Sequence, residues 1–430
     1  MLTHKDNELI CRVGPDTPQG KAHRRYWMPA CQVSDLEEMN GSPRRIRLLG
    51  EAFVLFRTPE GVLGFVDENC AHRGVSLMTG RVESGGIRCI FHGWKFAPDG
   101  ETLEIPNEIN PDFKKNVRAK SYPVREAGGL IWVYIGPQDK IPKFPEHRWF
   151  DVDKRHRLNA YLVENSNYVQ VLEALMDTSH VNILHQDAFQ VKGATDVAFG
   201  STVGKIMSDA APEIVVEDTE FGYLTAAIRA PGADGKRLVR TTSYIAPFQV
   251  YNANGDLWMA VIPIDDYNSV YYHVWWSTEN AVGEDPYAST QLKFIGLDKK
   301  ALTDFCLTHE TLESPNKPSF KNGFHQNREA IRRGWSFSGF HSLSQEDAGV
   351  IMSAGALKDR SNEHLCSADG PIRYMYRTLM YNAKAIEKGL DPIGLELNHR
   401  EIFAANAYLD DGEDWRKLAP SKKAFERKPL

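Results

Sequence analysis

Short alternating runs of apolar and polar residues occupy the first third of the chain and predict β-strands. In "EAFVLFRTPEGVLGFVDENC" (residues 51–70), two apolar runs flank a Pro-Glu-Gly turn, which is the pattern of a β-hairpin. A second β-rich run, "SYPVREAGGLIWVYIGP", is closed by Gly136 and Pro137. We therefore expect residues 44–142 to form short strands joined by turns.

The pattern changes after the polar, proline-punctuated stretch at residues 141–157, which we interpret as a domain boundary. Residues 165–185 predict a helix, because Val169, Leu172 and Met176 recur at helical spacing, and Asn165 or Ser166 can cap it. Strand-like runs follow, such as "YLTAAIRAP", "RTTSYIAPFQVY", "LWMAVIPI" and "SVYYHVWWSTEN". The last third turns helical, as in "RYMYRTLMYNAKAIEKGL".

Composition and charge narrow the class of protein. The chain has 430 residues, 42% hydrophobic and 25% charged, as in globular proteins, and this length predicts two domains. A formal net charge of -6 gives no electrostatic reason to expect nucleic acid or an anionic membrane as a partner. Apolar runs such as "GLIWVYIG" are too short to span a bilayer, and the start lacks a secretory signal pattern. We therefore expect a cytoplasmic protein with reduced cysteines.

Two cysteines and two histidines alternate in "CAHRGVSLMTGRVESGGIRCIFHGW". Cys70 and His72 are separated by one residue, Cys89 and His92 by two, and 16 residues lie between the pairs. Four such ligands at close spacing indicate a metal site. The remaining cysteines have no partner at such a spacing, and we expect them to be small buried apolar residues: Cys11, Cys31, Cys306 and Cys366.

Zinc is the simplest alternative for these ligands, because it binds mixed sets of Cys and His. Zinc sites, however, usually take paired ligands of one kind from each loop, whereas each loop here carries one Cys and one His. That arrangement suits a Rieske [2Fe–2S] centre, in which two thiolates bind one iron and two imidazoles bind the other. Gly74 and Gly93 directly follow the ligand loops, where the backbone has to approach the cluster without a Cβ.

The predicted helix contains a second group of metal-binding residue types. Asp177 and His180 are three residues apart, so we expect them on one helix face. His185 is five residues further, so the helix must end or distort if both imidazoles are to reach one ion. Packed, hydrogen-bonded histidines are the alternative interpretation. A Rieske cluster needs an electron acceptor, however, and two histidines with one carboxylate on iron(II) leave positions open for dioxygen and substrate.

The two motifs together resemble those of the Rieske non-haem iron aromatic-ring oxygenases, as the terminal α subunit, and the phthalate dioxygenase branch in particular. The similarity extends over nearly the whole chain. Its most specific part is "CAHRG…CIFHGWKF", and "EALMDTSHVNILH" is specific in combination with it. Supporting segments are "TPQGKAHRRYWMPA", "YPVREAGGLIWVYIGP" and "SQEDAGVIMSAGALKDRSNEHL".

This resemblance implies roles for individual residues. The expected cluster ligands are Cys70, His72, Cys89 and His92. His180 and His185 match the iron histidines, Asp347 best matches the third ligand, and the adjacent Glu346 is the fallback. Asp177 matches the family's bridging acid, which would hydrogen-bond His180 and a cluster histidine of a neighbouring subunit. For each of these acids, the alternative interpretation is an ordinary exposed carboxylate on a helix.

The resemblance also implies the fold, cofactors and partners. We expect an α+β protein with an N-terminal β Rieske [2Fe–2S] domain over 1–150 and a catalytic domain over 151–430. In the latter a curved antiparallel sheet would surround a mononuclear iron(II), and the N-terminal segment 1–43 would pack on this catalytic part. An NADH-dependent flavin/iron-sulfur reductase would supply electrons for the reaction with O2. A homotrimer or stacked trimers is the expected assembly.

The resemblance further implies an aromatic carboxylate substrate, and such an anion needs a cation in an apolar pocket. Lys205 and Arg240 lie nearest the positions expected for substrate anchors, with Arg229 and Arg237 as further candidates. A lysine where the branch tends to use arginine loses bidentate geometry, which weakens the case for ortho-phthalate and leaves isophthalate or a substituted benzoate open. Residues 186–202 are expected to form a loop over the mouth of the site.

We expect cis-dihydroxylation of this acid. An O-demethylating or monohydroxylating oxygenase acting on a methoxybenzoate remains an alternative that motifs do not separate from a dioxygenase. An electron-transfer protein with only a Rieske domain would leave 280 further residues and the histidine helix unexplained.

Overall fold

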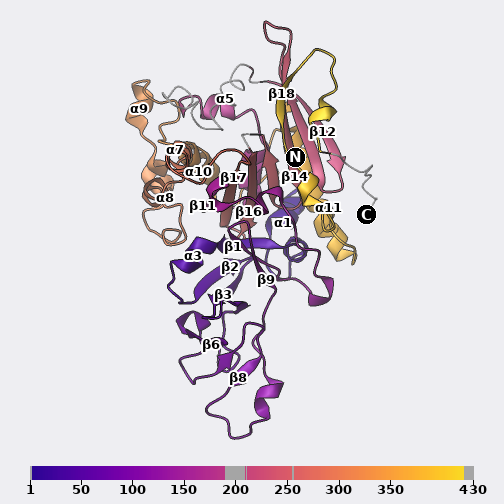
Figure 1. Ribbon diagram of the computed structural model, residues 1–430. Coiled ribbons are helices and arrows are strands. Elements are labelled where there is room, and N and C mark those ends of the chain that lie inside the picture. The colour runs from indigo at the N-terminus through magenta and orange to yellow at the C-terminus, as the bar shows by residue number, and fades with distance from the viewer. Residues whose placement is uncertain (1, 189–208, 210, 254–255, 421–430) are drawn as a thin grey trace. The chain divides into compact units, whose positions relative to one another are not determined.

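The computed structural model describes residues 2–188, 209, 211–253 and 256–420, and the chain divides into two compact units (Figure 1). The smaller unit comprises Gly14–Asp16 and His23–Phe144; the larger comprises Met1–Val13, Thr17–Ala22 and Pro145–Leu430. The division falls inside the polar stretch 141–157. The segment 1–43 does not behave as one piece, because residues 23–43 belong to the smaller unit.

Short antiparallel strands build the smaller unit, as the alternating pattern predicted. The expected hairpin is present as β3 (Glu51–Arg57) and β4 (Leu63–Asp67), and Gly61 in its turn has a φ of 86°, which favours glycine. Three sheets contain the strands β1 Met28–Gln32, β10 Leu130–Val133 and β9 Val124–Ala127; β2 Arg44–Leu48, β3 Glu51–Arg57 and β4 Leu63–Asp67; and β5 Arg81–Glu83, β6 Gly86–Arg88, β7 Lys95–Phe96 and β8 Thr102–Glu104.

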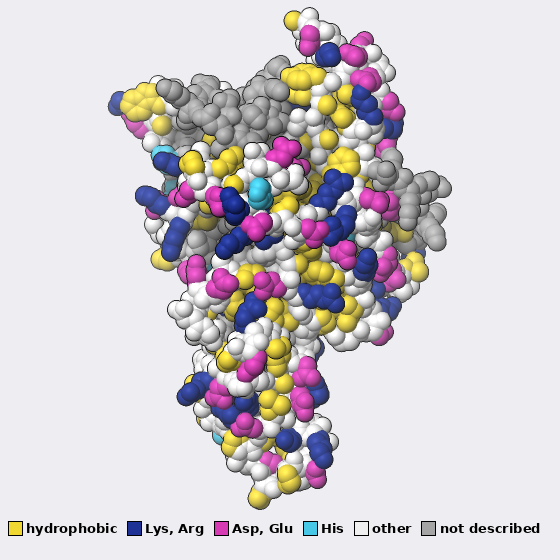
Figure 2. Space-filling model, in the orientation of Figure 1, with side chains coloured by type: hydrophobic (Ala, Val, Ile, Leu, Met, Phe, Trp, Pro, Cys, Tyr) yellow, Lys and Arg dark blue, Asp and Glu magenta, His cyan; other side chains and the backbone are white. Residues whose placement is uncertain are grey.

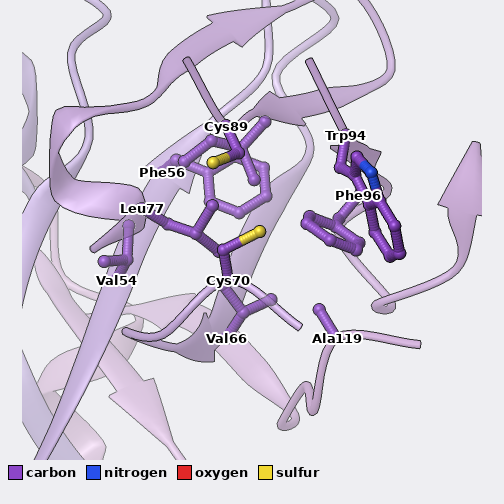
Figure 3. Packing of buried hydrophobic residues seen from close by; sticks show 10 residues of the cluster. Val54, Phe56, Val66, Cys70, Leu77, Cys89, Trp94, Phe96 and Ala119 are labelled. Carbon is purple, nitrogen blue, oxygen red and sulfur yellow. The ribbon is translucent and has the colours of Figure 1, made fainter. Parts of the chain in front are cut away.

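Two of the candidate cluster ligands lie in an apolar core of the smaller unit. Figure 3 shows the Cys70 and Cys89 side chains among apolar side chains from the strands and from the turns that follow them. The core consists of Val54, Phe56, Val66, Cys70, Leu77, Ile87, Cys89, Trp94, Phe96 and Ala119. The apolar surroundings hold the two cysteine-bearing turns in fixed positions and exclude water from the sulfur atoms.

A large antiparallel sheet dominates the larger unit. The strands pair in the order β11-β17-β16-β15-β14-β13-β12, and β18 adds to β14. Most of them come from the strand-like runs of the sequence, although "RTTSYIAPFQVY" forms two strands rather than one. Their bounds are β11 Arg157–Glu164, β12 Glu213–Thr219, β13 Gly222–Ile228, β14 Arg237–Ile245, β15 Gln249–Asn252, β16 Asp256–Pro263, β17 Ser269–Trp276 and β18 Asn406–Leu409.

A buried helix, α4 (Tyr168–Met176), packs against β16 and β17. Its N-cap is Asn167, whose side chain accepts a hydrogen bond from the Val169 amide, so the caps expected at Asn165 or Ser166 were wrong. The helix is apolar on most sides, as expected of a helix enclosed by other elements. The other helices of this unit include α1 His4–Cys11, α5 Val181–Leu184, α7 Tyr287–Ile295, α8 Lys299–Asp304, α9 Arg328–Arg332, α10 Leu343–Ser353 and α11 Gly370–Glu387.

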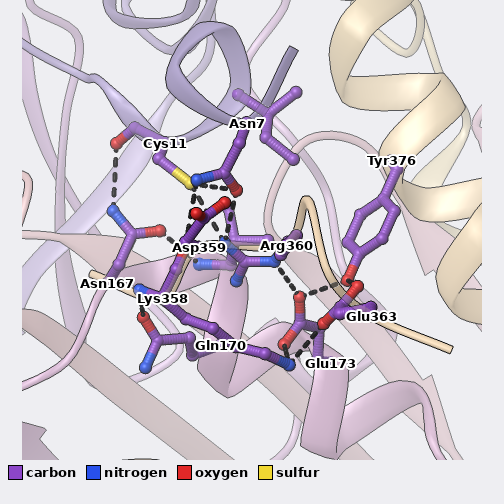
Figure 4. Close-up of polar contacts among 12 residues, drawn as sticks. Asn7, Cys11, Asn167, Gln170, Glu173, Lys358, Asp359, Arg360, Glu363 and Tyr376 are labelled. Atoms are coloured by element: carbon purple, nitrogen blue, oxygen red, sulfur yellow. Dashed lines mark hydrogen bonds and ion pairs between the residues drawn. The ribbon is translucent and has the colours of Figure 1, made fainter. Parts of the chain in front are cut away.

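A buried polar network fixes α4 against α1 and α11 (Figure 4). Glu173 of α4 accepts hydrogen bonds from Arg360 and from the hydroxyl of Tyr376 in α11. Arg360 is fully buried and also donates to Asn7 of α1 at 3.0 Å. Removing one partner would leave a buried charge uncompensated, so these contacts specify one position for α4 and for the residues that follow it.

The visible surface is mixed in charge. On the face shown in Figure 2, basic and acidic side chains are interspersed, in line with the formal net charge of -6. Among the described helices, none combines the length and the apolar character that a membrane crossing requires.

Candidate metal sites and the adjoining cavity

Two turns of the same construction present the cysteines and histidines of the smaller unit. The Cys70 amide donates to the carbonyl of Val75, and the Gly74 amide donates back to Cys70, both at 2.9 Å. In the second turn, the Cys89 amide donates to Trp94 at 2.9 Å and Gly93 donates back at 3.0 Å. Gly74 and Gly93 have φ values of 73° and 76°, a backbone conformation that favours glycine.

The four side chains of these turns form one group. The cysteines are both 3% exposed, whereas the two histidines are only partly buried. The rings of His72 and His92 lie 4.5 Å apart between centroids, and Trp94 stacks on His72 at 4.5 Å. Each turn thus contributes one inner sulfur and one outer imidazole.

This donor set fits a [2Fe–2S] cluster with two thiolate and two imidazole ligands. Burial raises the pKa of the Cys70 thiol to about 11, so an isolated thiolate would be unfavourable there without a bound cation. Burial and the neighbouring His92 lower the pKa of His72, which favours the neutral imidazole that a metal needs.

In the larger unit, the predicted helix 165–185 is broken where the candidate ligands occur. Helix α4 ends at Met176, and Asp177 follows with φ -83° and ψ 120°. His180 and His185 flank the short helix α5 at its two ends. The prediction that Asp177 and His180 share one helix face was therefore wrong, whereas the expected break before His185 is present. The break turns both imidazoles toward a common point, with ring centroids 5.1 Å apart.

The third candidate ligand comes from α10, far along the chain. Oδ1 of Asp347 lies 3.7 Å from Nε2 of His180 and 3.2 Å from Nε2 of His185. Ligand atoms of all three residues lie within 4.8 Å of one another. The adjacent Glu346 instead contacts Nδ1 of His185 at 2.7 Å, on the opposite edge of the ring. The geometry brings Asp347, and not the fallback Glu346, to the common point.

Two observations test whether these residues fit a cation. Oδ1 of Asp347 is buried and lacks a well-aligned hydrogen bond with any described residue, although Nε2 of His185 lies 3.2 Å away, so a cation between them would satisfy both atoms. Burial lowers the pKa of His185, but Asp347 and Glu346 outweigh it and raise the pKa to about 10, so positive charge is stabilised at this position. Two imidazoles and one carboxylate that face an open cavity are the ligand set of non-haem iron(II).

Asp177 is held by its own turn. Its Oδ1 accepts hydrogen bonds from the amide and hydroxyl of Ser179 at 2.7 Å and 2.6 Å, and its Oδ2 lies 3.5 Å from Nδ1 of His180. Burial opposes ionisation, yet the contacts from His180 and Ser179 lower the pKa of Asp177. The side chain is 22% exposed, so an ionised carboxylate that touches His180 also reaches the protein surface.

A cavity of about 120 Å³ adjoins the two histidines and Asp347. Its floor is one face of the large sheet, to which alternate residues of several strands contribute. The lining is largely apolar, with a few polar groups at defined points, as in ligand pockets. The apolar lining includes Leu162, Val171, Leu175, Ile214, Leu257, Met259, Trp275, Ile295, Leu343 and Ile351, and the polar lining includes Glu164, Thr178, Thr225, Arg240, Thr242, Asn252, Tyr271, His273 and Ser344.

Of the predicted anchors, Arg240 lies in this cavity wall. It is 5% exposed and donates hydrogen bonds to Thr178, at 3.3 Å, and to Asn252. Burial and the nearby Arg229 lower the pKa of its guanidinium, so an anion bound beside it would be stabilised. Arg237 instead pairs with Asp411 at 3.1 Å. Lys205 and most of the expected loop 186–202 lie outside the described residues.

Sequence reasoning did not predict three polar residues of this region. Glu346 was expected only as a fallback metal ligand, whereas its contact with Nδ1 of His185 orients that imidazole ring. Glu164 ends the strand β11 and His273 lies inside β17, and the side chains of both line the cavity. Burial lowers the pKa of His273 to about 3, so this imidazole is neutral. A signal was present, since an acid or an imidazole inside a buried strand is unusual.

Comparison with protein families assigns both units. Residues 26–123 match the Rieske [2Fe-2S] domain, and residues 133–429 match the family described as LigXa C-terminal domain like. Known proteins match over nearly the full length. The oxygenase subunit of phthalate 4,5-dioxygenase from Pseudomonas putida is 33% identical, covering 97% of this chain and 94% of its own.

Other similar proteins are named for a second dioxygenase, an O-demethylase and a monooxygenase. The oxygenase subunit of 3-chlorobenzoate-3,4-dioxygenase from Comamonas testosteroni is 32% identical, with 92% of each chain covered. The oxygenase subunit of 5,5'-dehydrodivanillate O-demethylase from Sphingobium sp. is 28% identical, covering 91% of this chain and 83% of its own. The crystal structure of dicamba monooxygenase bound to dicamba shares the fold, with a TM-score of 0.56 at 16% identity over 85% of this chain and 98% of that one.

Proposed function

The chain belongs to the Rieske non-haem iron oxygenases as an oxygenase α subunit, and we propose that it hydroxylates an aromatic carboxylate. One observation carries the proposal: the same apolar cavity is lined by His180, His185 and Asp347 and by the buried cation Arg240. The first set suits an iron that activates dioxygen, and Arg240 suits a carboxylate.

The metal assignments form part of this proposal. Cys70, Cys89, His72 and His92 would hold a [2Fe–2S] cluster, and His180, His185 and Asp347 would hold iron(II). When bound, the cluster supplies single electrons and the iron supplies dioxygen activation. We expect about three irons per chain, two in the cluster and one mononuclear. Stoichiometric zinc without acid-labile sulfide would contradict this assignment.

The protein side chains would bind and orient the substrate. Arg240 would pair with the carboxylate, while the apolar walls would exclude water and place the ring beside the metal site. Asn252 and Thr178 hydrogen-bond Arg240, so the position of its guanidinium is set before the substrate enters. Lys205 stays a second candidate anchor.

Asp177 would serve electron transfer between subunits. Its contacts with Ser179 and His180 hold the carboxylate beside an iron ligand, and its partial exposure would allow a hydrogen bond to a cluster histidine of a neighbouring subunit. This role needs a homotrimer or stacked trimers, in which the cluster of one subunit meets the iron of the next. An NADH-dependent flavin/iron-sulfur reductase would be the external partner.

Two reaction types are compatible with this site. The two dioxygenase relatives support cis-dihydroxylation of a phthalate, an isophthalate or a substituted benzoate. The relative named as an O-demethylase supports a second candidate, oxidative removal of an O-methyl group or single hydroxylation of a methoxybenzoate-type acid. Dihydroxylation adds dioxygen, two electrons and two protons to the ring, whereas demethylation releases a phenol and formaldehyde.

The test is a turnover assay with defined products. The purified protein would be incubated with a reductase, NADH, dioxygen and a panel of benzoates, phthalates and methoxybenzoates, followed by mass analysis. A product that has gained two oxygen and two hydrogen atoms supports dihydroxylation, and loss of a CH2 unit supports demethylation. Turnover of neutral aromatics in preference to every acid would overturn the carboxylate assignment.

A further inference from the structure

Glu164 is a buried acid in the cavity wall that the proposed reaction leaves without a role. We propose that Glu164 is a specificity residue, which donates a hydrogen bond to a neutral oxygen substituent, ether or hydroxyl, on the ring of the substrate. The proposal rests on the proposed function, because it places an aromatic acid in this cavity.

The position of Glu164 in the sheet explains why its side chain reaches the cavity. It is the last residue of β11, where it pairs with Ser269 of β17, and it is 1% exposed. Leu162, two residues earlier on the same strand face, lines the cavity as well. An apolar side chain would satisfy this packing position, so a carboxyl group there needs a polar explanation.

The hydrogen bonds that the described residues make with Glu164 leave the hydroxyl of its protonated carboxyl group without an acceptor. Ser166 donates its hydroxyl proton to Oε2 at 3.2 Å, and this is the one hydrogen bond that the Glu164 side chain makes with the described residues. A buried carboxyl group that carries its own proton needs an acceptor as well. The cavity is where such an acceptor can lie, because Glu164 forms part of its wall.

Glu164 carries that proton near neutral pH. Burial, and secondly the charge of Asp347, raise its pKa to about 8. Burial is the larger cause, and burial does not depend on the charge of Asp347. Two further titratable side chains of the cavity, Tyr271 and His273, are neutral as well, since burial raises the pKa of the phenol and lowers that of the imidazole. The acid therefore acts as a donor and not as a carboxylate.

The two polar ends of the cavity suit a ring with two different substituents. Arg240 is on β14 and Glu164 on β11, with β15, β16 and β17 between them in the sheet. A carboxylate held by Arg240 would direct the far side of the ring toward Glu164. A neutral oxygen group there, such as methoxy or hydroxyl, would accept the proton of Glu164 without burying a second charge, so we expect it to be preferred.

Equilibrium binding tests this inference without turnover. Calorimetry on the purified protein, without reductase or NADH, would compare methoxybenzoates with ethyl-substituted benzoates at each ring position, since the two groups have similar shape and only the first has an acceptor. We expect the wild type to bind one methoxy isomer about tenfold more tightly than its ethyl counterpart. Glu164→Gln keeps a donor and should retain this ratio, whereas Glu164→Leu should abolish it.

The controls separate the possible failures. Asp256→Asn removes an exposed acid on β16 and should leave the ratio unchanged. Iron content and thermal unfolding would show whether each variant is folded. If the wild type shows no preference for the oxygen substituent, or Glu164→Leu retains it, the role of Glu164 is overturned while the proposed function stands. If no aromatic acid binds the wild type, the proposed function itself fails.

Discussion

The imidazole of His185 lies 2.7 Å from Glu346, with its Nδ1 atom facing Oε2 of that carboxylate. The other ring nitrogen, Nε2, faces Asp347, the next residue of the same helix. Ser338 donates a hydrogen bond to the second oxygen of Glu346 at 2.6 Å. Two consecutive acids thus contact opposite edges of one ring, so the first fixes the tautomer that presents Nε2 to a metal.

Glu346→Ala should weaken metal binding at the histidine pair, because His185 loses the acceptor that orients it. We expect the affinity for Fe(II) or Co(II) to fall about 10–100-fold, with the cluster unaffected. Glu346→Gln keeps an acceptor and should retain most of the affinity. Metal-binding titration would measure both variants, and wild-type affinity in Glu346→Ala would refute the orienting role.

Asp177→Asn should separate metal binding from electron transfer. The amide oxygen can still accept the two hydrogen bonds from Ser179, so the turn should persist, but the charge and the acceptor that faces His180 are lost. We expect full iron content and reoxidation of the reduced cluster slowed by about 100-fold. Stopped-flow absorbance would follow this reaction, and a near-normal rate would exclude the bridging role.

Arg240→Ala should weaken binding of aromatic acids, because a buried carboxylate would lose its cation. Truncation of one partner of a buried charge pair costs about 2–5 kcal/mol, which corresponds to at least about 30-fold in Kd. Arg237→Ala is the matched control on the same strand, since that side chain pairs with Asp411. Binding assays with benzoate, phthalate and isophthalate would measure both variants. An unchanged Kd for every acid would move the anchor to Lys205 or Arg229.

Two buried histidines should make the larger unit sensitive to acid. His147 and His399 lie 4.6 Å apart between ring centroids, and burial lowers the pKa of His399 to about 4 and that of His147 well below its ordinary value. In the unfolded chain these histidines bind protons near pH 6.5, whereas the folded protein keeps them neutral to a lower pH. Their contribution to the free energy of unfolding is therefore fully present above pH 6.5 and is lost as the pH falls toward 4.

The side chain of His399→Gln stays neutral throughout this range. Between pH 6.5 and pH 4, the free energy of unfolding should therefore fall less in this variant than in the wild type, by on the order of 3 kcal/mol. Urea unfolding at several pH values would measure the difference. His4→Gln, at an exposed histidine, is the control and should keep the wild-type pH dependence. Equal acid losses in His399→Gln and wild type would contradict the assignment.

Much of the architecture follows from local sequence patterns. Strands show a hydrophobic period of two residues and helices one of 3.6, and both periods can be read from residues that are close in the sequence. This is why the pattern predicted the hairpin over 51–70, the strand-like runs and the last long helix. The Cys–His turns could be recognised for a similar reason, because all four side chains come from 23 consecutive residues. The break before His185 was also foreseeable, since two imidazoles five residues apart cannot both reach one ion from a continuous helix.

The partners of these local motifs depended on the tertiary structure. Glu346 and Asp347 are chemically similar neighbours, and successive helix residues point about 100° apart, so only the rotation of α10 against α5 decides which of them faces both histidines. Arg237 and Arg240 are three apart on one strand and therefore point to opposite faces, but the sheet decides which face lines the cavity. The same applies to Glu164: a mostly apolar run precedes this acid in the sequence, and only the pairing of β11 with β17 places its side chain in the wall of the cavity.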